Sequence, residues 1–287
     1  MPADLADALY TPTSDRALTI EALERGKIVF LPGYSFLFTP EEEIFLNPNA
    51  VAANSKTIKF SPTTKKIWGT ADQHNDSPAL TGLMARYSAF ARDLVDRLFP
   101  RYATSRIIGN ASFRPVEAAG RVQSRRHDDQ LLHIDSFPSR PTNGKRILRV
   151  FANVNPDGQS RCWQAGEPFA AIAARFIPRI SAPLPGSAAL MHLLKITKEK
   201  RSPYDHYMMH IHDAMKLDDI YQATTLHTDL ALPAGSTWIA FTDEVSHAAL
   251  SGQHAMEQTF LLPLAAMHDP THSPLQTLET LKSQPLL

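Results

Sequence analysis

Arg146-Ile147-Leu148-Arg149-Val150-Phe151-Ala152-Asn153-Val154-Asn155 is the stretch of this chain that predicts its fold most clearly. Its residues alternate between two faces with a period of two, which is typical of a β-strand. The run is largely apolar, so we expect it in the interior, and the turn Pro156-Asp157-Gly158 follows it. Arg149 therefore lies in the middle of a buried strand, where a charge must have a partner.

The segments around this strand predict an α+β, β-rich fold. Further strands are expected at 27–31, 106–113, 130–135, 236–242 and 255–262, and helices at 13–25, 78–99, 167–176 and 203–215. Strands crowd the centre and second half, and helices crowd the front, which favours a double-stranded β-helix (jelly-roll) core with supporting helices. We expect one domain over 1–287, with mainly helical support in 1–105, the jelly-roll core in 106–265 and a C-terminal tail in 266–287.

Composition excludes several classes of function. The 287 residues contain 29 Lys plus Arg and 29 Asp plus Glu, so net charge gives no reason to expect binding to nucleic acid. Cys162 is the only cysteine, which rules out an intrachain disulfide and a cysteine-rich metal site. The first ten residues do not resemble a signal peptide, and no segment reaches the 18 apolar residues of a membrane span.

His133-Ile134-Asp135, together with His247, is the main candidate for a functional site. Residues two apart on a strand point to the same face, so His133 and Asp135 can present both ligands together. His247 lies 114 residues further on and can approach them if a barrel brings distant strands together. Two imidazoles and one carboxylate on one face of Fe(II) are typical of non-heme iron oxygenases.

Other histidines compete for this role. A second H-x-D, His227-Thr228-Asp229, lies only 20 residues before His247, which leaves room for a single strand between them. His254, just beyond the turn at 251–253, is the main competitor of His247 as third ligand.

A histidine cluster on the helix expected at 203–215 is a separate metal candidate. His206 and His210 are four residues apart, a spacing used for zinc, and His212 follows them. The intervening residues do not form an H-E-x-x-H motif, so a packed helix with a solvated histidine face is the simpler interpretation.

An iron site of this kind leaves positions for a 2-oxo acid, whose far carboxylate needs a cation. A bidentate guanidinium suits that task. Many enzymes of this class carry an arginine about ten residues after the distal histidine. Positions 256–258 are instead Met, Glu and Gln, so the arginine must come from elsewhere.

Arg149 is the arginine that we expect to bind the co-substrate. Asn153 lies four residues on and on the same face, and Gln258 or Thr259 could add hydrogen bonds from the last strand. The alternative is structural, with Arg149 paired to Glu257 across the sheet.

Several long motifs resemble the 3-deoxy-D-manno-oct-2-ulosonic acid (Kdo) hydroxylases. They are His133-Ile-Asp-Ser-Phe-Pro-Ser-Arg-Pro-Thr142, Arg146-Ile-Leu-Arg-Val-Phe-Ala-Asn-Val-Asn-Pro156, Ser202-Pro-Tyr-Asp-His-Tyr-Met208, His212-Asp-Ala-Met-Lys216, Asp243-Glu-Val-Ser-His-Ala-Ala-Leu-Ser-Gly252 and Glu257-Gln-Thr-Phe260. The resemblance covers most of the chain and is strongest over 121–263. It implies a jelly-roll core and assigns His133, Asp135 and His247 as iron ligands. It also agrees with Glu-Gln-Thr in place of the downstream arginine.

The resemblance implies an oxygenase that uses Fe(II), 2-oxoglutarate and O₂, with ascorbate expected to stimulate it. The implied reaction is hydroxylation of carbon 3 of Kdo on lipid A of Gram-negative bacteria, which gives the sugar Ko. Because Kdo carries a carboxylate and lipid A carries phosphates, we expect basic residues that flank the H-x-D motif to bind them. These are Arg114, Arg121, Arg125, Arg126 and Arg140.

The expected partner is Kdo-lipid A or a related glycolipid, and the expected location is cytoplasmic, with peripheral contact at the inner membrane. The loop 34–38 and the C-terminal leucines are weak candidates for that contact, since core packing explains them as well. Two other functions stay open: a 2-oxoglutarate oxygenase acting on another sugar or small metabolite, and a non-catalytic, cupin-like sugar-binding protein.

Overall fold

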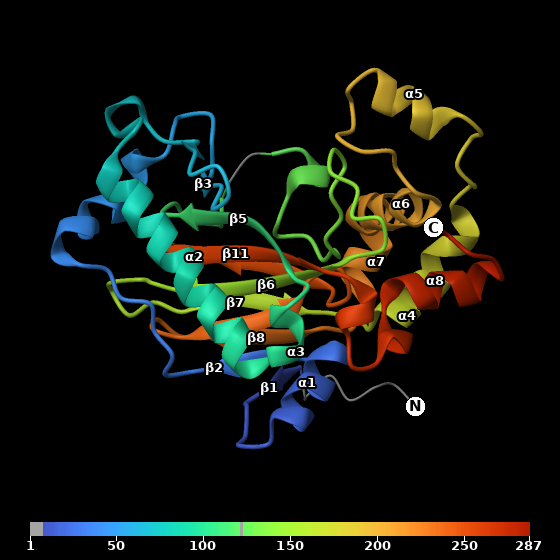
Figure 1. Cartoon of the computed structure of the whole chain (residues 1–287), viewed down its shortest axis with the longest axis horizontal. Helices are drawn as coiled ribbons and strands as arrows, with labels where there is room; N and C mark the ends of the chain where they lie inside the picture. The colour runs from blue at the N-terminus through green and yellow to red at the C-terminus, as the bar shows by residue number, and fades with distance from the viewer. Residues whose placement is uncertain (1–7, 121–122) are drawn as a thin grey trace.

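The computed structural model describes residues 8–120 and 123–287, and two β-sheets with surrounding helices make up its architecture (Figure 1). The larger sheet has the strand order β1-β2-β9-β6-β11-β5-β3-β4, and the smaller has the order β10-β7-β8. The strands are β1 (Leu9–Tyr10), β2 (Ile28–Leu31), β3 (Ile58–Phe60), β4 (Ile67–Trp68), β5 (Ile107–Arg114), β6 (Arg146–Asn153), β7 (Arg161–Ala165), β8 (Thr228–Leu232), β9 (Thr237–Phe241), β10 (His247–Ser251) and β11 (Ala255–Leu262). The predicted α+β class with a jelly-roll core is confirmed.

The helices lie outside the sheets. They are α1 (Arg16–Glu24), α2 (Pro78–Leu98), α3 (Pro100–Ala103), α4 (Phe169–Phe176), α5 (Ser187–Leu193), α6 (Pro203–Leu217), α7 (Asp219–Thr224) and α8 (Pro274–Lys282). Short 3-10 turns also occur at Pro40–Leu46, Pro48–Ala50, Asp72–His74, Arg125–His127, Ile177–Arg179, Leu264–Ala266 and Pro270–His272. In the described residues, no helix combines the length and the hydrophobicity that a membrane crossing requires.

Strand β6 lies near the centre of the larger sheet, as its alternating sequence predicts. It pairs antiparallel with β9 on one side and β11 on the other, so both of its edges are hydrogen-bonded. One face packs against α2, which runs across the outside of the sheet (Figure 1). The Tyr87 hydroxyl of α2 donates to the carbonyl of Val150 at 3.0 Å. The other face of β6, which carries Arg149 and Phe151, points toward the smaller sheet and encloses the site.

The N-terminal part differs from the expectation of mainly helical support, because it also supplies β1 to β4 to the larger sheet. Helix α1 is shorter than expected and begins at Arg16, since the Asp15 carboxylate accepts a hydrogen bond from the Ala17 amide. Helix α2 begins as predicted, with Ser77 as its cap and Pro78 in its first turn.

The C-terminal segment is more ordered than the expected tail. It forms α8, which packs beside α4 at the end of the sheets (Figure 1). Leu275, Leu278 and Leu286 are buried there among residues of α4 and α6. The spacing of three between Leu275 and Leu278, together with the cap at Ser273, was a helical signal in the sequence. Each such buried side chain contributes about 1.5–3 kcal/mol to stability.

The strand expected at 130–135 is not formed. Only His133 pairs, in an isolated antiparallel bridge with His247. The segment is nevertheless locally extended, because the Asp135 amide donates to the carbonyl of Thr242 at 2.7 Å. This part of the chain therefore forms a short extended segment beside β10, the edge strand of the smaller sheet.

Candidate metal centre and adjoining cleft

Three side chains converge where the segment around 133 meets β10. One ligand atom from each of His133, Asp135 and His247 lies within 4.8 Å of the other two. The backbones of His133 and His247 exchange two hydrogen bonds, of 3.0 and 2.8 Å, which hold the two rings side by side. In the described part of the chain, this is the only group of three such residues close enough to share a metal ion.

Each histidine ring is oriented by a backbone carbonyl. The Nδ1 atom of His133 lies 2.7 Å from the Leu131 oxygen, and that of His247 lies 2.8 Å from the Val245 oxygen. A carbonyl only accepts, so both Nδ1 atoms carry the proton and both Nε2 atoms keep a lone pair. Burial lowers the pKa of both rings below the usual value, so they are neutral, as metal ligands must be.

Asp135 completes the site with a charged oxygen that lacks a hydrogen bond. Burial opposes its ionisation, but the charge of Arg149 lowers the pKa of this carboxyl to about 2. Its Oδ2 atom is buried and makes no hydrogen bond, although Arg149 forms an ion pair with it at 3.1 Å. A buried anionic oxygen beside two imidazole lone pairs fits a divalent metal, and this ligand set on one face is typical of Fe(II).

A small cavity of about 80 Å³ opens beside these ligands, and three arginines line it. Arg149 forms a second ion pair with Glu257, at 2.9 Å, and Arg114 pairs with Asp129 at 3.0 Å. Both of these charges are therefore already balanced by protein carboxylates.

Arg161 is the third arginine, and its charge is not balanced. It is buried, and its guanidinium donates to the Gly252 carbonyl at 3.0 Å. Within residues 8–120 and 123–287, no carboxylate lies within ion-pair distance of it. Burial, followed by the charge of Arg114, lowers the pKa of Arg161 to about 9, so it is still a cation at neutral pH. A buried cation without an anionic partner marks a place for an anionic ligand.

The residues expected to bind the co-substrate are only partly brought together. Arg149 lines the cavity, and the alternative pairing with Glu257 occurs as well. Asn153 does not reach the cavity: it lies about 13 Å further along the strand and donates to the carbonyls of Gln159 and Leu232. Gln258 faces the opposite side of the sheet, because it is one residue from Glu257, and donates to Gly109.

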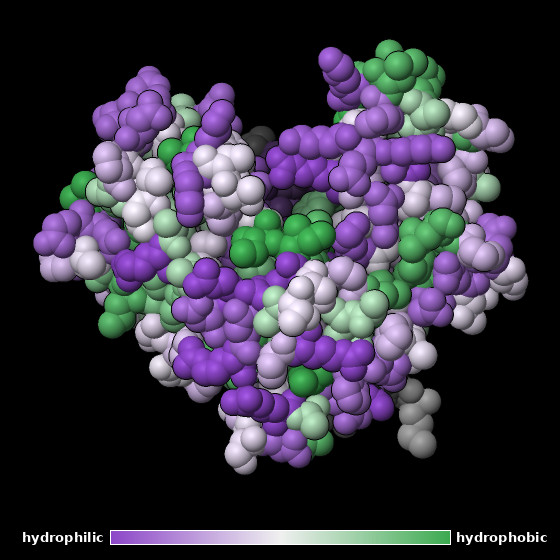
Figure 2. Space-filling view, viewed as in Figure 1, coloured by the Kyte–Doolittle hydropathy of each residue, from purple (hydrophilic) through white to green (hydrophobic). Residues whose placement is uncertain are grey.

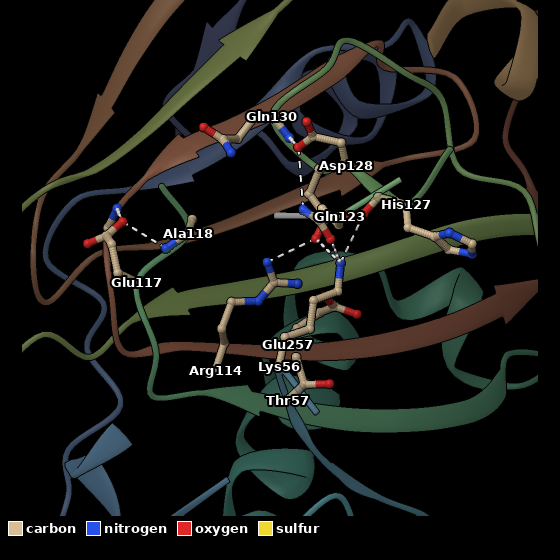
Figure 3. Close-up of polar contacts among 12 residues, drawn as sticks. Lys56, Thr57, Arg114, Glu117, Ala118, Gln123, His127, Asp128, Gln130 and Glu257 are labelled. Carbon is tan, nitrogen blue, oxygen red and sulfur yellow. Dashed lines mark hydrogen bonds and ion pairs between the residues drawn. The ribbon is translucent and has the colours of Figure 1, made fainter. Parts of the chain in front are cut away.

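A larger cleft of about 730 Å³ continues outward from the small cavity, and Asp135 and Arg149 line both. Thr259 lies on the cleft wall. Figure 3 shows how Lys56 and Arg114 point toward the segment that contains Gln123, His127 and Asp128. The Lys56 ammonium binds Asp129 at 2.7 Å and the His127 carbonyl at 3.3 Å, and thereby holds the segment before the H-x-D motif against the cleft.

Two of the five basic residues expected at the substrate site line the cleft, namely Arg114 and Arg140. Arg125 and Arg126 do not; they form surface ion pairs, at 2.6 Å with Asp219 and at 3.0 Å with Asp213. Proximity in sequence was misleading here, since the 3-10 turn at Arg125–His127 directs them toward α6 and α7. Arg121 lies outside the described residues.

The competing histidines lie elsewhere. His254 is hydrogen-bonded to the Leu46 carbonyl at 2.9 Å and to Asn155, and His227 is exposed. His206 and His210 lie next to each other on α6, with tilted rings whose centroids are 4.3 Å apart, and neither belongs to the site.

Two aromatic neighbours of the ligands were not expected from the sequence. The Trp163 ring stacks on His247 with centroids 5.2 Å apart, and the His212 ring meets His133 edge-on at 5.6 Å. Arg161 and Trp163 lie on the same face of β7, which follows the turn at 156–158. The period-two pattern of 161–165 was the sequence signal that could have predicted this.

Known proteins resemble this chain over its whole length, in sequence and in structure. The model of the 3-deoxy-D-manno-oct-2-ulosonic acid (Kdo) hydroxylase family matches residues 7–285. The apo structure of the Kdo hydroxylase KdoO, described as a non-heme Fe(II) alphaketoglutarate dependent dioxygenase, is 42% identical, with 97% of each chain covered and a TM-score of 0.92.

Two further structures of KdoO are similar to the same degree. The complex with alphaketoglutarate and Fe(III) is 42% identical, covers 100% of this chain and 96% of that chain, and has a TM-score of 0.91. The complex with succinate and Fe(III) is 43% identical, with the same coverage and TM-score. Among curated proteins, no match was found. The resemblance in the sequence motifs is confirmed, and the chain belongs to the Kdo hydroxylase family.

Proposed function

We propose that this protein is an Fe(II)/2-oxoglutarate/O₂-dependent dioxygenase that hydroxylates carbon 3 of Kdo on Kdo-lipid A and so forms Ko in lipopolysaccharide. The observation that carries the proposal is the site of His133, Asp135 and His247, which opens onto an arginine-lined cavity and a larger cleft. Membership of the Kdo hydroxylase family supports the substrate, and the iron and alphaketoglutarate bound by KdoO support the cofactors.

The protein's own groups account for binding and orientation. His133, Asp135 and His247 would hold the iron through two Nε2 atoms and one carboxylate oxygen. Fe(II) supplies the O₂ chemistry, which is coupled to oxidation of 2-oxoglutarate. Arg161 receives the far carboxylate of 2-oxoglutarate in the small cavity, whose wall also contains Arg149 and Arg114, each paired with a protein carboxylate.

The outer cleft would receive the sugar. Because it shares Asp135 and Arg149 with the small cavity, a ligand in the cleft lies beside the metal ligands. Its volume is within the range of about 300–1,000 Å³ that is usual for small-molecule sites. The rings of Trp163 and Phe151 contact each other and form an apolar part of the cavity wall.

The lipid part of the substrate points to contact with a membrane surface, at the cytoplasmic side of the inner membrane. An apolar segment beside the cleft suits that contact (Figure 2, upper right). It spans residues 184–196, includes α5, and exposes Leu184, Leu190, Leu193, Leu194 and Ile196, with Leu193 at 77% exposure. Lys195 lies within it and could meet anionic head groups. The segments first considered are only partly exposed: Phe36, Leu278 and Leu286 are buried, whereas Leu37, Leu281 and Leu287 are exposed.

The reaction is tested by mass spectrometry. The protein is incubated with Kdo-lipid A, Fe(II), 2-oxoglutarate, ascorbate and O₂. We expect a gain of one oxygen on Kdo and formation of succinate. Succinate without oxygen on Kdo would favour the alternative of another sugar or small metabolite as substrate, and no succinate with any candidate would favour a non-catalytic sugar-binding protein.

The membrane contact has its own test. Sedimentation with vesicles that contain phosphatidylglycerol should retain the wild-type protein and lose the L190D/L193D variant. Ile220 on α7 is 76% exposed and lies outside the segment, so I220D is the matched control and should sediment like the wild type. Equal binding of L190D/L193D and wild type would refute this surface.

A further inference from the structure

The outer cleft contains more positive charge than its own carboxylates balance. Six basic side chains and four acidic ones line it. Lys56 and Arg114 share Asp129, and Arg149 bridges the metal ligand Asp135 and Glu257. The remaining basic side chains form no ion pair within the described part of the chain, and these are Lys59, Arg140 and Lys198.

These three cations come from two separate parts of the cleft wall. Lys59 is exposed on β3, near the edge of the larger sheet. Arg140 and Lys198 belong to two loops that are joined by a hydrogen bond of 2.9 Å from the Lys198 amide to the Ser139 carbonyl. An anionic group in the cleft therefore meets positive charge from the sheet and from the loops.

The wall that carries Arg140 is anchored to the fold. The buried Asp205 carboxylate at the start of α6 accepts from the Thr142 amide at 2.7 Å and from the Asn143 amide at 3.2 Å. The Asn143 side chain in turn donates to Glu199, the one remaining acid of the cleft, at 3.1 Å. That acid is thus engaged by a neutral amide and not by the three cations.

Trp68 adds an aromatic surface beside these charges. It lies opposite Lys59 in the register of β3 and β4, lines the cleft and is 38% exposed. Large aromatic side chains are normally buried, and a half-exposed one on a cleft wall provides a face for an apolar ligand surface. A sugar ring has such a surface on its C–H side and hydroxyl groups around its edge.

We propose that Lys59, Arg140, Lys198 and Trp68 form a subsite for an acidic sugar, in which the cations hold its anionic group and the indole packs against its ring. This inference rests on the proposed function and extends it to substrate selection. The anion of the substrate is bound in the outer cleft, separately from the co-substrate carboxylate at Arg161 in the small cavity. Sugars without an anionic group are bound weakly.

Steady-state kinetics with Kdo-lipid A in detergent micelles test the subsite. Each cation is exposed, so a single substitution to Ala should raise KM by about threefold to fivefold. The triple variant K59A/R140A/K198A should raise KM at least about thirtyfold and lose most of the salt dependence of KM. The KM for 2-oxoglutarate should change less than about threefold, because Arg161 is intact. W68A should raise KM for Kdo-lipid A but keep the salt dependence.

The matched control removes the same charge elsewhere. R16A/K66A/R101A lacks three exposed basic residues outside the cleft and should keep the wild-type KM for both substrates. A triple cleft variant with the KM of this control would overturn the subsite.

Dephosphorylated Kdo-lipid A identifies the anionic group. If the triple variant has a raised KM for both Kdo-lipid A and its dephosphorylated form, the cations hold the sugar carboxylate. If its KM for the dephosphorylated form equals that of the wild type, the cations hold a phosphate. Should the wild type add no oxygen to Kdo, the proposed function fails, and calorimetric titration with free Kdo then tests the subsite alone. Binding by the wild type with loss in K59A/R140A/K198A would support it, and equal or absent binding would refute it.

Discussion

The Nε atom of Arg149 lies 3.1 Å from a carboxylate oxygen of Asp135, and this ion pair joins the metal site to the co-substrate cavity. The guanidinium also reaches Glu257 at 2.9 Å, so it is held between two strands of the larger sheet and the H-x-D segment. One arginine thereby keeps a metal ligand ionised and forms part of the wall of the adjoining cavity.

Replacing Arg149 or Arg161 should have different consequences. R149A should raise KM for 2-oxoglutarate more than about tenfold and also weaken metal binding, because the charge beside Asp135 is lost. R161A should raise KM for 2-oxoglutarate similarly but leave metal affinity within about threefold, since Arg161 does not contact a ligand. Kinetics and calorimetric titration with Co(II) measure both quantities. A metal affinity lowered equally in both variants would contradict this division of roles.

Removing a metal ligand should abolish metal binding without unfolding the chain. H133A, D135A and H247A should each lower Co(II) affinity by more than about 100-fold, because even partners behind the ligands contribute 10–100-fold. H254A is the matched control, since that histidine binds Leu46 and Asn155 instead. Circular dichroism checks the fold, and wild-type affinity in H247A would refute its assignment.

A methyl group at Gly252 should disturb Arg161. Gly252 has φ +110°, and a Cβ there would lie 2.9 Å from the Arg161 Cα atom. G252A should lower the free energy of unfolding by about 2 kcal/mol and raise KM for 2-oxoglutarate. Gly158 has φ +75° with open space around it, so G158A measures the backbone cost alone, about 1 kcal/mol. Equal effects of both variants on KM would show that Arg161 is not displaced.

Glu244 should make stability depend on pH. Burial raises the pKa of this carboxyl from 4.5 to about 7, against the attraction of Arg146. The folded state then binds more protons than the unfolded state between these values, so stability falls as pH rises through this window. The free energy of unfolding of the wild type should therefore fall relative to E244Q from pH 4.5 to about 7 and then stay level. Urea titrations across this pH range measure both free energies of unfolding. A difference between wild type and E244Q that does not change with pH would contradict the prediction.

Local sequence patterns were sufficient for the main elements. Period-two alternation predicted β6, and the Ser77-Pro78 start with a helical apolar stripe predicted α2, because backbone conformation and capping are set by neighbours in sequence. The same local rules placed His133 and Asp135 on one side. They were insufficient for Asn153 and Gln258, because strand pairing decides which face and which part of each strand meets the cavity, and these two side chains bind carbonyls outside it.

The sequence by itself determined the jelly-roll class, the family and the placement of His133 and Asp135 on one side, because each depends on local motifs or spacing. His247 was assigned from the sequence through the family resemblance, with His254 as its competitor, and its contact with His133 is set by the tertiary structure. Only the tertiary structure decided which arginines act together. Arg146 is balanced by Asp243 and Glu244, Arg149 by Asp135 and Glu257, and Arg161 by no carboxylate in the described residues. The role of a buried charge depends on which opposite charges lie within a few ångströms, and strand pairing across more than ninety residues sets those distances.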